Sequence, residues 1–358
     1  MVTGSYPPLK CGIGDYTHSL AKALADRNIK MAVLTSSSGD KQSDADGAEV
    51  FPLVNRWGFR DLRKVLTAFR RWTPDIVHVQ YPTQGYGRRW LPNMLPLIAF
   101  LMGKKVVQTW HEGIGWRNVP RYLLQAIIPG GLVAVRPQYR ERLPLLLRWG
   151  LWNKTFACIK NASAIPLAEL DDQQKSLLRN KYLNGQKRLI VFFGFVYPHK
   201  GVELLFQIAD PVSDQIVIAG EIDKDGAAHQ EILQRASAAP WQDKVTVTGF
   251  MPSNDIAELL AVADAVILPF RLGGGEWNTS LHGAVRQGTL VITTSKVKNG
   301  YDPQANVYYA KVDDVQEMKT ALNMHAGARR PSRAEFDDDE WPQIAAEHHL
   351  LYEAVLSR

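Results

Sequence analysis

Two segments place glycine beside groups that could hold a phosphate. In Tyr6–Tyr16 (YPPLKCGIGDY), Gly12 and Gly14 lie between an expected strand end and a helix start. Further along, Lys200 and Gly201 follow a buried strand and open an expected helix. Glycine lets a backbone approach a ligand closely, and unbonded amides at a helix start attract anions. Both segments therefore predict contacts with phosphate, although a plain tight turn also explains the first and a solvated lysine the second.

A third glycine-rich segment, 268–294, begins with a strand and continues through GGGEW. Asn278, Thr279 and Ser280 then begin a helix, and their amides are expected to form an anion nest. Glu276 lies in the loop, where its carboxylate could accept hydrogen bonds from sugar hydroxyls or simply face solvent. A sugar phosphate fits this combination of groups.

The first loop departs from the dinucleotide-binding fingerprint. Thr17 stands where the third glycine of G-x-G-x-x-G belongs, and the second strand ends at Thr35-Ser36-Ser37 without the acid that would hold a ribose. An NAD-linked oxidoreductase is therefore disfavoured.

Two histidines occur in the predicted strands of the first half. His111, in TWHEG, ends a strand and is either a ligand-facing residue or a structural one, and His78 is expected to be structural. His348 and His349 are expected to be surface and packing residues. No Cys/His set has the spacing of zinc ligands, so no metal is expected.

Both halves alternate short apolar runs with helical periodicity, which predicts two parallel sheets with ligands at the carboxyl ends of the strands. Val2-Thr3 is expected to end a first strand whose beginning is missing. The polar stretch 171–187 is expected to link the halves. The expected strands are 30–35, 75–80, 105–109, 132–135, 188–194, 215–219, 244–248, 265–268 and 289–293; the expected helices are 16–28, 62–72, 201–209, 230–238, 255–262, 280–287 and 341–356.

Length and composition agree with a two-domain globular protein. The 358 residues are 46% hydrophobic, and the two cysteines, Cys11 and Cys158, are expected to be reduced thiols in the cytoplasm. The first residues show no signal-peptide pattern, and the most apolar stretch, 91–103, is too short to span a membrane.

Charge is unevenly distributed along the chain. Residues 1–180 hold 25 Lys and Arg against 13 Asp and Glu, whereas residues 181–358 hold 17 against 23. Seven of the ten tryptophans precede residue 160, and four of these seven lie in basic clusters at 56–72 and 136–154. This combination favours an anionic membrane surface as a partner, although a solvated basic helix with core tryptophans fits equally. No nucleic-acid recognition module is evident.

Segments along nearly the whole chain resemble glycosyltransferase family 4. They are YPPLKCGIGDYTHSLAKAL, DIVHVQY, TWHEG, GFVYPHKGVELL, VTGFMPSNDIAELLAVADAVILPF, NTSLHGAVRQGTLVITT and the closing W-x-x-I-A-x-x-H-x-x-L-Y. The resemblance implies a GT-B fold of two Rossmann-like domains facing across a cleft. It implies an acceptor domain at 1–170, a nucleotide-sugar domain at 171–335 and a C-terminal helix at 336–358 that packs back on the first domain.

The resemblance also implies roles for individual residues. His111 and Glu276 would be catalytic residues near the transferred sugar. The donor phosphates would meet Gly12, Gly14, Lys200, Thr279, Ser280 and Leu281, and the nucleotide base would meet Phe250 and Met251.

Two features depart from the family pattern. The arginine usual before the lysine is absent, because Phe195, Val196 and Tyr197 occupy the nearby positions; Arg271 is a candidate substitute. Gly283 stands at the second glutamate of the family's pair. A catalytically weakened binding or scaffold protein therefore remains an alternative, and a GT-B epimerase or phosphorylase fits less well.

The resemblance implies a retaining hexosyltransferase in cell-surface polysaccharide synthesis. Its partners would be a nucleotide-diphosphate sugar, a glycan or lipid-linked acceptor and an anionic membrane surface, but not nucleic acid. It would lie in the cytoplasm or peripherally at the inner face of the membrane. No cofactor beyond the nucleotide-sugar co-substrate is implied.

Overall fold

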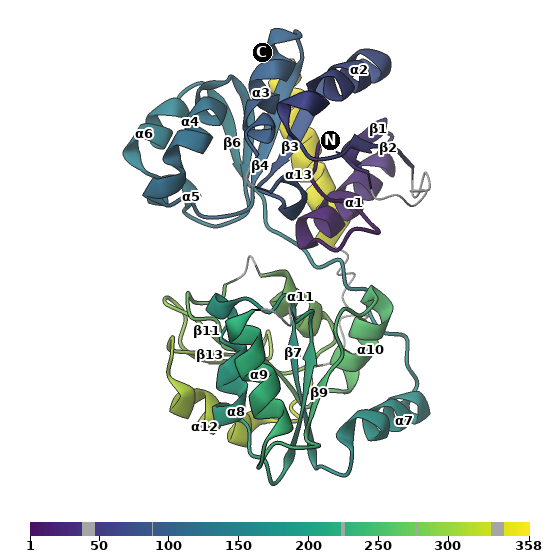
Figure 1. The fold of residues 1–358 in the computed structure, drawn as a ribbon, viewed down its shortest axis with the longest axis vertical. Coiled ribbons are helices and arrows are strands. Elements are labelled where there is room, and N and C mark those ends of the chain that lie inside the picture. Colours follow the sequence, from purple (N-terminus) through teal and green to yellow (C-terminus); the bar gives the residue numbers. More distant parts are fainter. Residues whose placement is uncertain (38–46, 88, 223–225, 276–277, 331–339) are drawn as a thin grey trace. The chain divides into compact units, whose positions relative to one another are not determined.

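The computed structural model describes residues 1–37, 47–87, 89–222, 226–275, 278–330 and 340–358. The chain forms two compact units (Figure 1). Unit 1 comprises residues 1–162 and 339–358, and unit 2 comprises residues 163–338. Each unit is described separately below.

Unit 1 is built on parallel strands. They are β1 (Met31–Ser36), β2 (Ala48–Val54), β3 (Ile76–Tyr81), β4 (Lys105–Trp110), β5 (Gly130–Ala134) and β6 (Lys154–Cys158). β1 pairs with β2, and β3 to β6 pair in sequence order. Val2 forms parallel bridges to Leu34 and Val79 and so lies between β1 and β3. Val2-Thr3 thus takes the strand position that the sequence indicates.

Helices cover both faces of the unit 1 sheet. They are α1 (Gly12–Ala25), α2 (Leu62–Trp72), α3 (Leu91–Leu101), α4 (Val119–Ile127), α5 (Tyr139–Arg142), α6 (Leu145–Gly150) and α13 (Glu340–Leu356). One apolar cluster packs α2 to α6 against the sheet, and another joins α1 and α13 to β1, β2, β4 and β5. The helix at the C-terminal end of the sequence, α13, contacts α1, β4, β5 and β6 (Figure 1).

Unit 2 contains a sheet in the order β12-β13-β11-β10-β7-β8-β9. Its strands are β7 (Arg188–Phe193), β8 (Asp214–Ala219), β9 (Val245–Val247), β10 (Ala265–Leu268), β11 (Val291–Thr294), β12 (Gly300–Asp302) and β13 (Val307–Ala310). All described pairings are parallel except that of β12 with β13. Its helices are α7 (Asp172–Leu183), α8 (Leu205–Ile208), α9 (Ala227–Ser237), α10 (Ser253–Val262), α11 (Thr279–Arg286) and α12 (Val315–His325).

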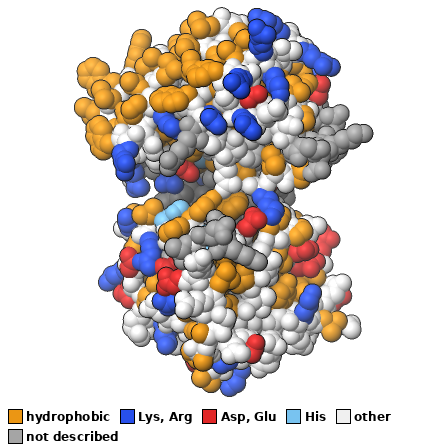
Figure 2. Space-filling view, viewed as in Figure 1, with side chains coloured by type: hydrophobic (Ala, Val, Ile, Leu, Met, Phe, Trp, Pro, Cys, Tyr) orange, Lys and Arg blue, Asp and Glu red, His pale blue; other side chains and the backbone are white. Residues whose placement is uncertain are grey.

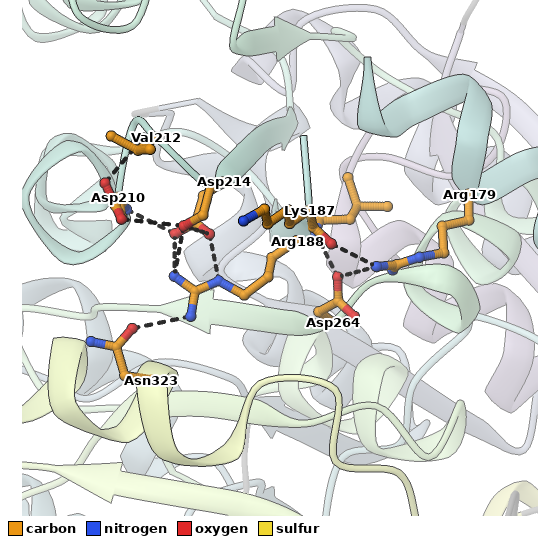
Figure 3. Close-up of polar contacts among 10 residues, drawn as sticks. Arg179, Lys187, Arg188, Asp210, Val212, Asp214, Asp264 and Asn323 are labelled. Carbon is orange, nitrogen blue, oxygen red and sulfur yellow. Dashed lines mark hydrogen bonds and ion pairs between the residues drawn. The ribbon is translucent and has the colours of Figure 1, made fainter. Parts of the chain in front are cut away.

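Charged side chains fix the amino-terminal edge of this sheet (Figure 3). Arg188 binds the fully buried Asp214 through Nε and Nη2 at 2.5 and 2.9 Å, which ties the start of β7 to the start of β8. Asp264, just before β10, accepts from the Leu189 amide at 2.6 Å and from Arg179 of α7 at 2.7 Å. A bidentate pair at a strand start holds the register of neighbouring strands.

Two expected elements differ in the structure. The polar stretch 171–187, expected as the linker, contains α7, whose Asp171 and Gln174 form a reciprocal capping box. The expected helix at 201–209 is instead one short 3₁₀ turn, Val202–Leu204, followed by α8, and a separate 3₁₀ turn, Pro198–Lys200, precedes Gly201. Gly201 causes this break, because its φ is +66° and a Cβ there would lie 2.3 Å from the Pro269 carbonyl oxygen.

Candidate functional site

His111 lies at the carboxyl end of β4, inside a buried polar network of unit 1. Its Nε2 lies 2.8 Å from Gln80 Oε1, and its ring meets the edge of Tyr16 of α1 at 5.0 Å between centroids. The Gln80 amide lies 3.4 Å from His78. His111 is therefore held in place by neighbours on both β3 and α1.

The C-terminal helix α13 completes this network. His78 contacts Thr109 Oγ1 through Nε2 and the Tyr352 hydroxyl through Nδ1, both at 2.7 Å. His348, also on α13, contacts the Tyr16 hydroxyl at 3.4 Å. His348, expected at the surface or in packing, is fully buried. The closing W-x-x-I-A-x-x-H-x-x-L-Y pattern thus places His348 and Tyr352 beside the histidines of β3 and β4.

Burial keeps these histidines neutral. It lowers the pKa of His111 to about 3 and that of His348 to about 4, and it holds the pKa of His78 well below its usual value. A neutral imidazole can exchange hydrogen bonds with a sugar hydroxyl but places no charge near a donor. His111 therefore suits orientation and polarisation of a bound sugar.

The loop before α1 contains two glycines with different surroundings. A Cβ on Gly14 would lie 2.8 Å from the Ser5 carbonyl oxygen, so the close approach of loop and helix requires glycine. Gly12 faces open space within 4 Å. Cys11, the N-cap residue, provides no side-chain cap to the first amides. Gly12 is thus the glycine of this pair that a ligand could approach.

Asp15, in the first turn of α1, is a candidate that the sequence reasoning did not single out. Burial raises its pKa to about 6. A carboxyl that titrates near neutrality can exchange a proton with an acceptor hydroxyl. In the sequence, the GIGD pattern indicates only an acid in the first turn of a helix, which is common. That Asp15 is partly buried becomes evident only in the folded structure.

Lys200 of unit 2 follows the carboxyl end of β7. Its Nζ lies 4.1 Å from the centroid of Phe270, which follows β10. The left-handed Gly201 fits against Pro269 in the same loop. These contacts tie the lysine to the ends of two adjacent parallel strands, where ligands of such sheets bind.

The start of α11 lies at the same edge. A Cβ built on Gly194, at the end of β7, would lie 3.0 Å from Ser280 Oγ, and one on Gly220, after β8, would lie 2.2 Å from the Gly194 carbonyl oxygen. Glycine at both positions therefore lets β7, β8 and α11 converge.

The expected anion nest of Thr279, Ser280 and Leu281 is partly closed. Asn278 caps α11, because its side chain accepts from the Ser280 amide at 3.1 Å, and its carbonyl accepts from the Leu281 amide at 3.1 Å. These two amides can bind a phosphate only if their hydrogen bonds to Asn278 break. The NTS pattern favours such a cap, since asparagine is among the preferred N-cap residues.

Arg271, the candidate substitute for the missing arginine, is paired with two acids, although its amide donates to the carbonyl of His199 beside Lys200. Its guanidinium binds Glu203 at 2.5 Å and Asp313 at 2.8 Å. The hydrogen bonds that Arg271 donates to Glu203 are the largest cause that raises the pKa of Arg271. Gly283 likewise leaves little room for an acid, because a Cβ there would lie 3.1 Å from Ser163 Oγ and 3.3 Å from Ile165.

The remaining predicted site residues divide into two groups. Phe250 and Met251 follow β9, so they lie beyond the carboxyl end of a third parallel strand; Phe250 is half exposed and Met251 packs on the unit 2 core. Glu276 lies outside the described residues. In the described part of the chain, no three His, Cys, Asp or Glu side chains gather as a metal site requires.

Comparison with known proteins decides the family. The family model for the glycosyl transferase 4-like domain matches residues 11–155, and that for glycosyl transferases group 1 matches residues 187–325. This chain is a glycosyltransferase of the family 4 type.

Relatives of this glycosyltransferase agree in fold more than in sequence. The chain is 29% identical over 133 residues to the glycosyltransferase YtcC of Bacillus subtilis (strain 168), a match that covers 34% of this chain and 31% of YtcC. It thus matches less than a third of that relative's length.

Two solved structures share the fold over almost the full length. HepE from Anabaena, in complex with UDP-glucose, has a TM-score of 0.71 at 14% identity and matches 100% of this chain and 99% of HepE. WaaG, a glycosyltransferase involved in lipopolysaccharide biosynthesis, has a TM-score of 0.64 at 14% identity over 99% and 97%. The glycosyltransferase therefore has the GT-B fold of two Rossmann-like domains.

Proposed function

We propose that this glycosyltransferase transfers a hexose, with retention of configuration, from a nucleotide-diphosphate sugar to a glycan or lipid-linked acceptor in cell-surface polysaccharide synthesis. One observation carries the proposal: Lys200, Phe250 and the start of α11 follow the carboxyl ends of parallel strands of one sheet. Residues at this edge can surround one donor. The similarity to HepE, which binds UDP-glucose, and to WaaG supports this class of donor and pathway.

In this proposal, unit 2 stabilises the leaving group. The bond between the sugar C1 and the diphosphate oxygen breaks, and negative charge develops on the diphosphate. Lys200 balances that charge, and the amides at the start of α11 add to it where Asn278 yields. Placed charges and dipoles that meet a developing anion are effective because they need little reorganisation.

Unit 1 would receive the sugar and the acceptor. The acceptor oxygen forms the new bond to C1 from the leaving-group side, and its proton passes to the departing diphosphate. Neutral His111 would orient the sugar by hydrogen bonding, and Gly12 would leave room for the donor. Neither a nucleophile of the protein nor a metal takes part in this scheme.

A catalytically weakened GT-B binding protein is the second candidate. Two observations favour it: Arg271 is held by Glu203 and Asp313, and Asn278 occupies the amides of Ser280 and Leu281. Such a protein would bind the donor without consuming it.

A thermal-shift screen of UDP-, GDP- and ADP-sugars tests the donor assignment. A ligand at 100 times its dissociation constant adds about 2.7 kcal/mol of stability, so one of these sugars should raise the melting temperature clearly. Release of nucleotide diphosphate on adding an acceptor separates the enzyme from the binding protein. Failure of every nucleotide sugar to stabilise the protein would exclude both candidates.

A further inference from the structure

An exposed apolar surface lies over the short helices of unit 1. We call it the α4–α6 face, and it consists of Leu123, Ile127, Leu145, Leu146, Trp149 and Trp152, each at least 39% exposed. Figure 2 shows hydrophobic side chains gathered in this region of the molecule. Soluble monomers seldom leave such a patch without a partner.

The packing of α6 explains why these side chains point outward. Leu147 is fully buried, and a Cβ on Gly150 would lie 2.8 Å from the Ala126 Cβ of α4. With this side of α6 pressed against α4, the other side presents Leu145, Leu146 and Trp149 to solvent. Trp149 and Trp152 are 76% and 80% exposed, more than any other aromatic side chain in the described ranges.

The charge around this face is strongly positive. Residues 113–154 contain six arginines and one lysine against a single acid, Glu141. Lys154 is buried, but Arg117, Arg140, Arg142 and Arg148 are exposed. Arg148 lies directly beside Trp149. Indole rings favour the interface between headgroups and acyl chains, and arginine attracts anionic headgroups.

The other basic cluster, 56–72, lacks this combination. Trp57 is fully buried, donates to Ser36 Oγ at 2.7 Å and packs against Tyr86. Trp72 donates to Glu49 at 3.1 Å. The cluster at 56–72 therefore presents cations, but its two indole groups form contacts within unit 1.

We propose that the α4–α6 face docks on an anionic bilayer, with Trp149, Trp152, Leu145 and Leu146 inserted at the headgroup level. None of the helices in the described ranges has the length and hydrophobicity to cross a membrane, so the docking is interfacial. The proposal rests on the proposed function in one respect, because a lipid-linked acceptor would lie at such a surface.

Vesicle sedimentation of the full chain tests the docking. The parent should sediment with vesicles that contain about a third phosphatidylglycerol, and added salt should release it, because the attraction to surface charge is screened. Trp149→Ser with Trp152→Ser should weaken binding at least tenfold. Leu177→Ser with Val212→Ser, which removes exposed apolar groups from unit 2, should bind as the parent does.

A charge comparison locates the surface. Arg142→Glu with Arg148→Glu should lower vesicle binding about tenfold, whereas Arg63→Glu with Lys64→Glu on α2 should change it little. Equal losses in the two charge variants would overturn the assignment to α4–α6. Parent-like binding of the double tryptophan variant would also overturn it, as would equal binding to neutral and anionic vesicles or binding to neither.

Two further measurements separate this proposal from its alternatives. Sedimentation velocity should show a monomer in the parent; a dimer that dissociates in the double tryptophan variant would make the face a contact between copies and overturn docking. Donor binding, followed by thermal shift, should be the same in all variants. Donor binding without vesicle binding would refute docking alone, whereas vesicle binding without donor binding would refute the proposed function alone.

Discussion

Lys200 sits over an aromatic ring, and this contact defines what the lysine can do. Its Nζ lies 4.1 Å from the Phe270 centroid, an attraction of about 0.5–1 kcal/mol at a partly exposed position. A diphosphate competes easily with so weak a contact. The ring therefore holds the ammonium group near the ends of β7 and β10.

Lys200→Ala should weaken nucleotide-sugar binding about 10- to 100-fold, because a hydrogen bond to a charged group contributes about 1.5–3 kcal/mol. Calorimetric titration measures the loss. Lys175→Ala is the matched control, since Lys175 is an exposed lysine of unit 2 that lies 3.9 Å from the exposed Asp172. Equal donor affinity in Lys200→Ala and the parent would remove Lys200 from the site.

His111→Ala should slow transfer about 100-fold through loss of a placed hydrogen-bonding group, and leave nucleotide affinity unchanged because His111 belongs to unit 1. Separate measurements of kcat and of the donor Kd distinguish a loss of turnover from a loss of nucleotide binding. His111→Asn, which keeps a polar partner for Gln80, guards against misfolding, and His349→Ala on the more open side of α13 is the control. A collapse of nucleotide affinity in both His111 variants would mean that His111 is structural.

At the scale of elements, α13 brings His348 and Tyr352 into the buried network of β3 and β4. The three histidines have lowered pKa values in the folded state, so only the unfolded chain binds their protons as pH falls below about 6.5. Stability is therefore present above that pH and is lost as pH falls toward about 4 for His348 and about 3 for His111.

Asp15 acts in the opposite direction. Its pKa of about 6 lies above the unfolded value, so its contribution is present at low pH and is lost as pH rises through 6. Between pH 4 and 6 it offsets part of the effect of the histidines. These groups together should make unfolding of unit 1 easier in acid.

His348→Gln tests this balance through the pH dependence of stability. Denaturant titrations from pH 7.5 to 5 should show a loss of stability in the parent. The glutamine variant should lose less, by up to about 1.4 kcal/mol per pH unit, because one titrating group is gone. Identical pH dependence in parent and variant would show that His348 titrates alike in both states.

Elements with one clear periodicity could be predicted from the sequence. Residues 62–72 form α2 over the expected range, and the apolar run 75–80 forms β3. The helix α3 was missed because Pro92 and Pro96 interrupt a continuous apolar stretch. The helix α7 was missed because most of its residues are polar and those that pack on the core, Leu178, Tyr182 and Leu183, are only partly buried. Sequence periodicity predicts helices in which apolar and polar residues alternate at helical spacing, and neither α3 nor α7 shows that alternation.

The candidate site was predictable in its residue types but not in their partners. Lys200 could be placed at a strand end from spacing alone. That Arg271 is paired with Glu203 and Asp313, and that Asn278 caps α11, depends on side chains up to 68 residues apart. Likewise, the sequence could not tell the buried Trp57 from the exposed Trp149, since both lie among arginines.

At the scale of the whole molecule, unit 1 is assembled from both ends of the sequence. Its two apolar clusters lie on opposite faces of the sheet, and the cluster on one of them includes Trp341, Ile344 and Leu351 of α13. The face that holds the buried histidines thus depends on residues that follow all of unit 2.

This arrangement has a consequence for how the protein is made. A ribosome adds about 5–20 residues per second, so roughly 10–40 s separate the synthesis of β6 from that of α13. During that interval unit 2 can fold from contiguous chain, whereas Val107 and Val133 of unit 1 await their covering helix. The newly made first half therefore exposes apolar residues of its sheet until α13 is synthesised. Loss of the last twenty residues would leave these residues exposed, and we expect such a truncated chain to be bound by chaperones and cut by proteases.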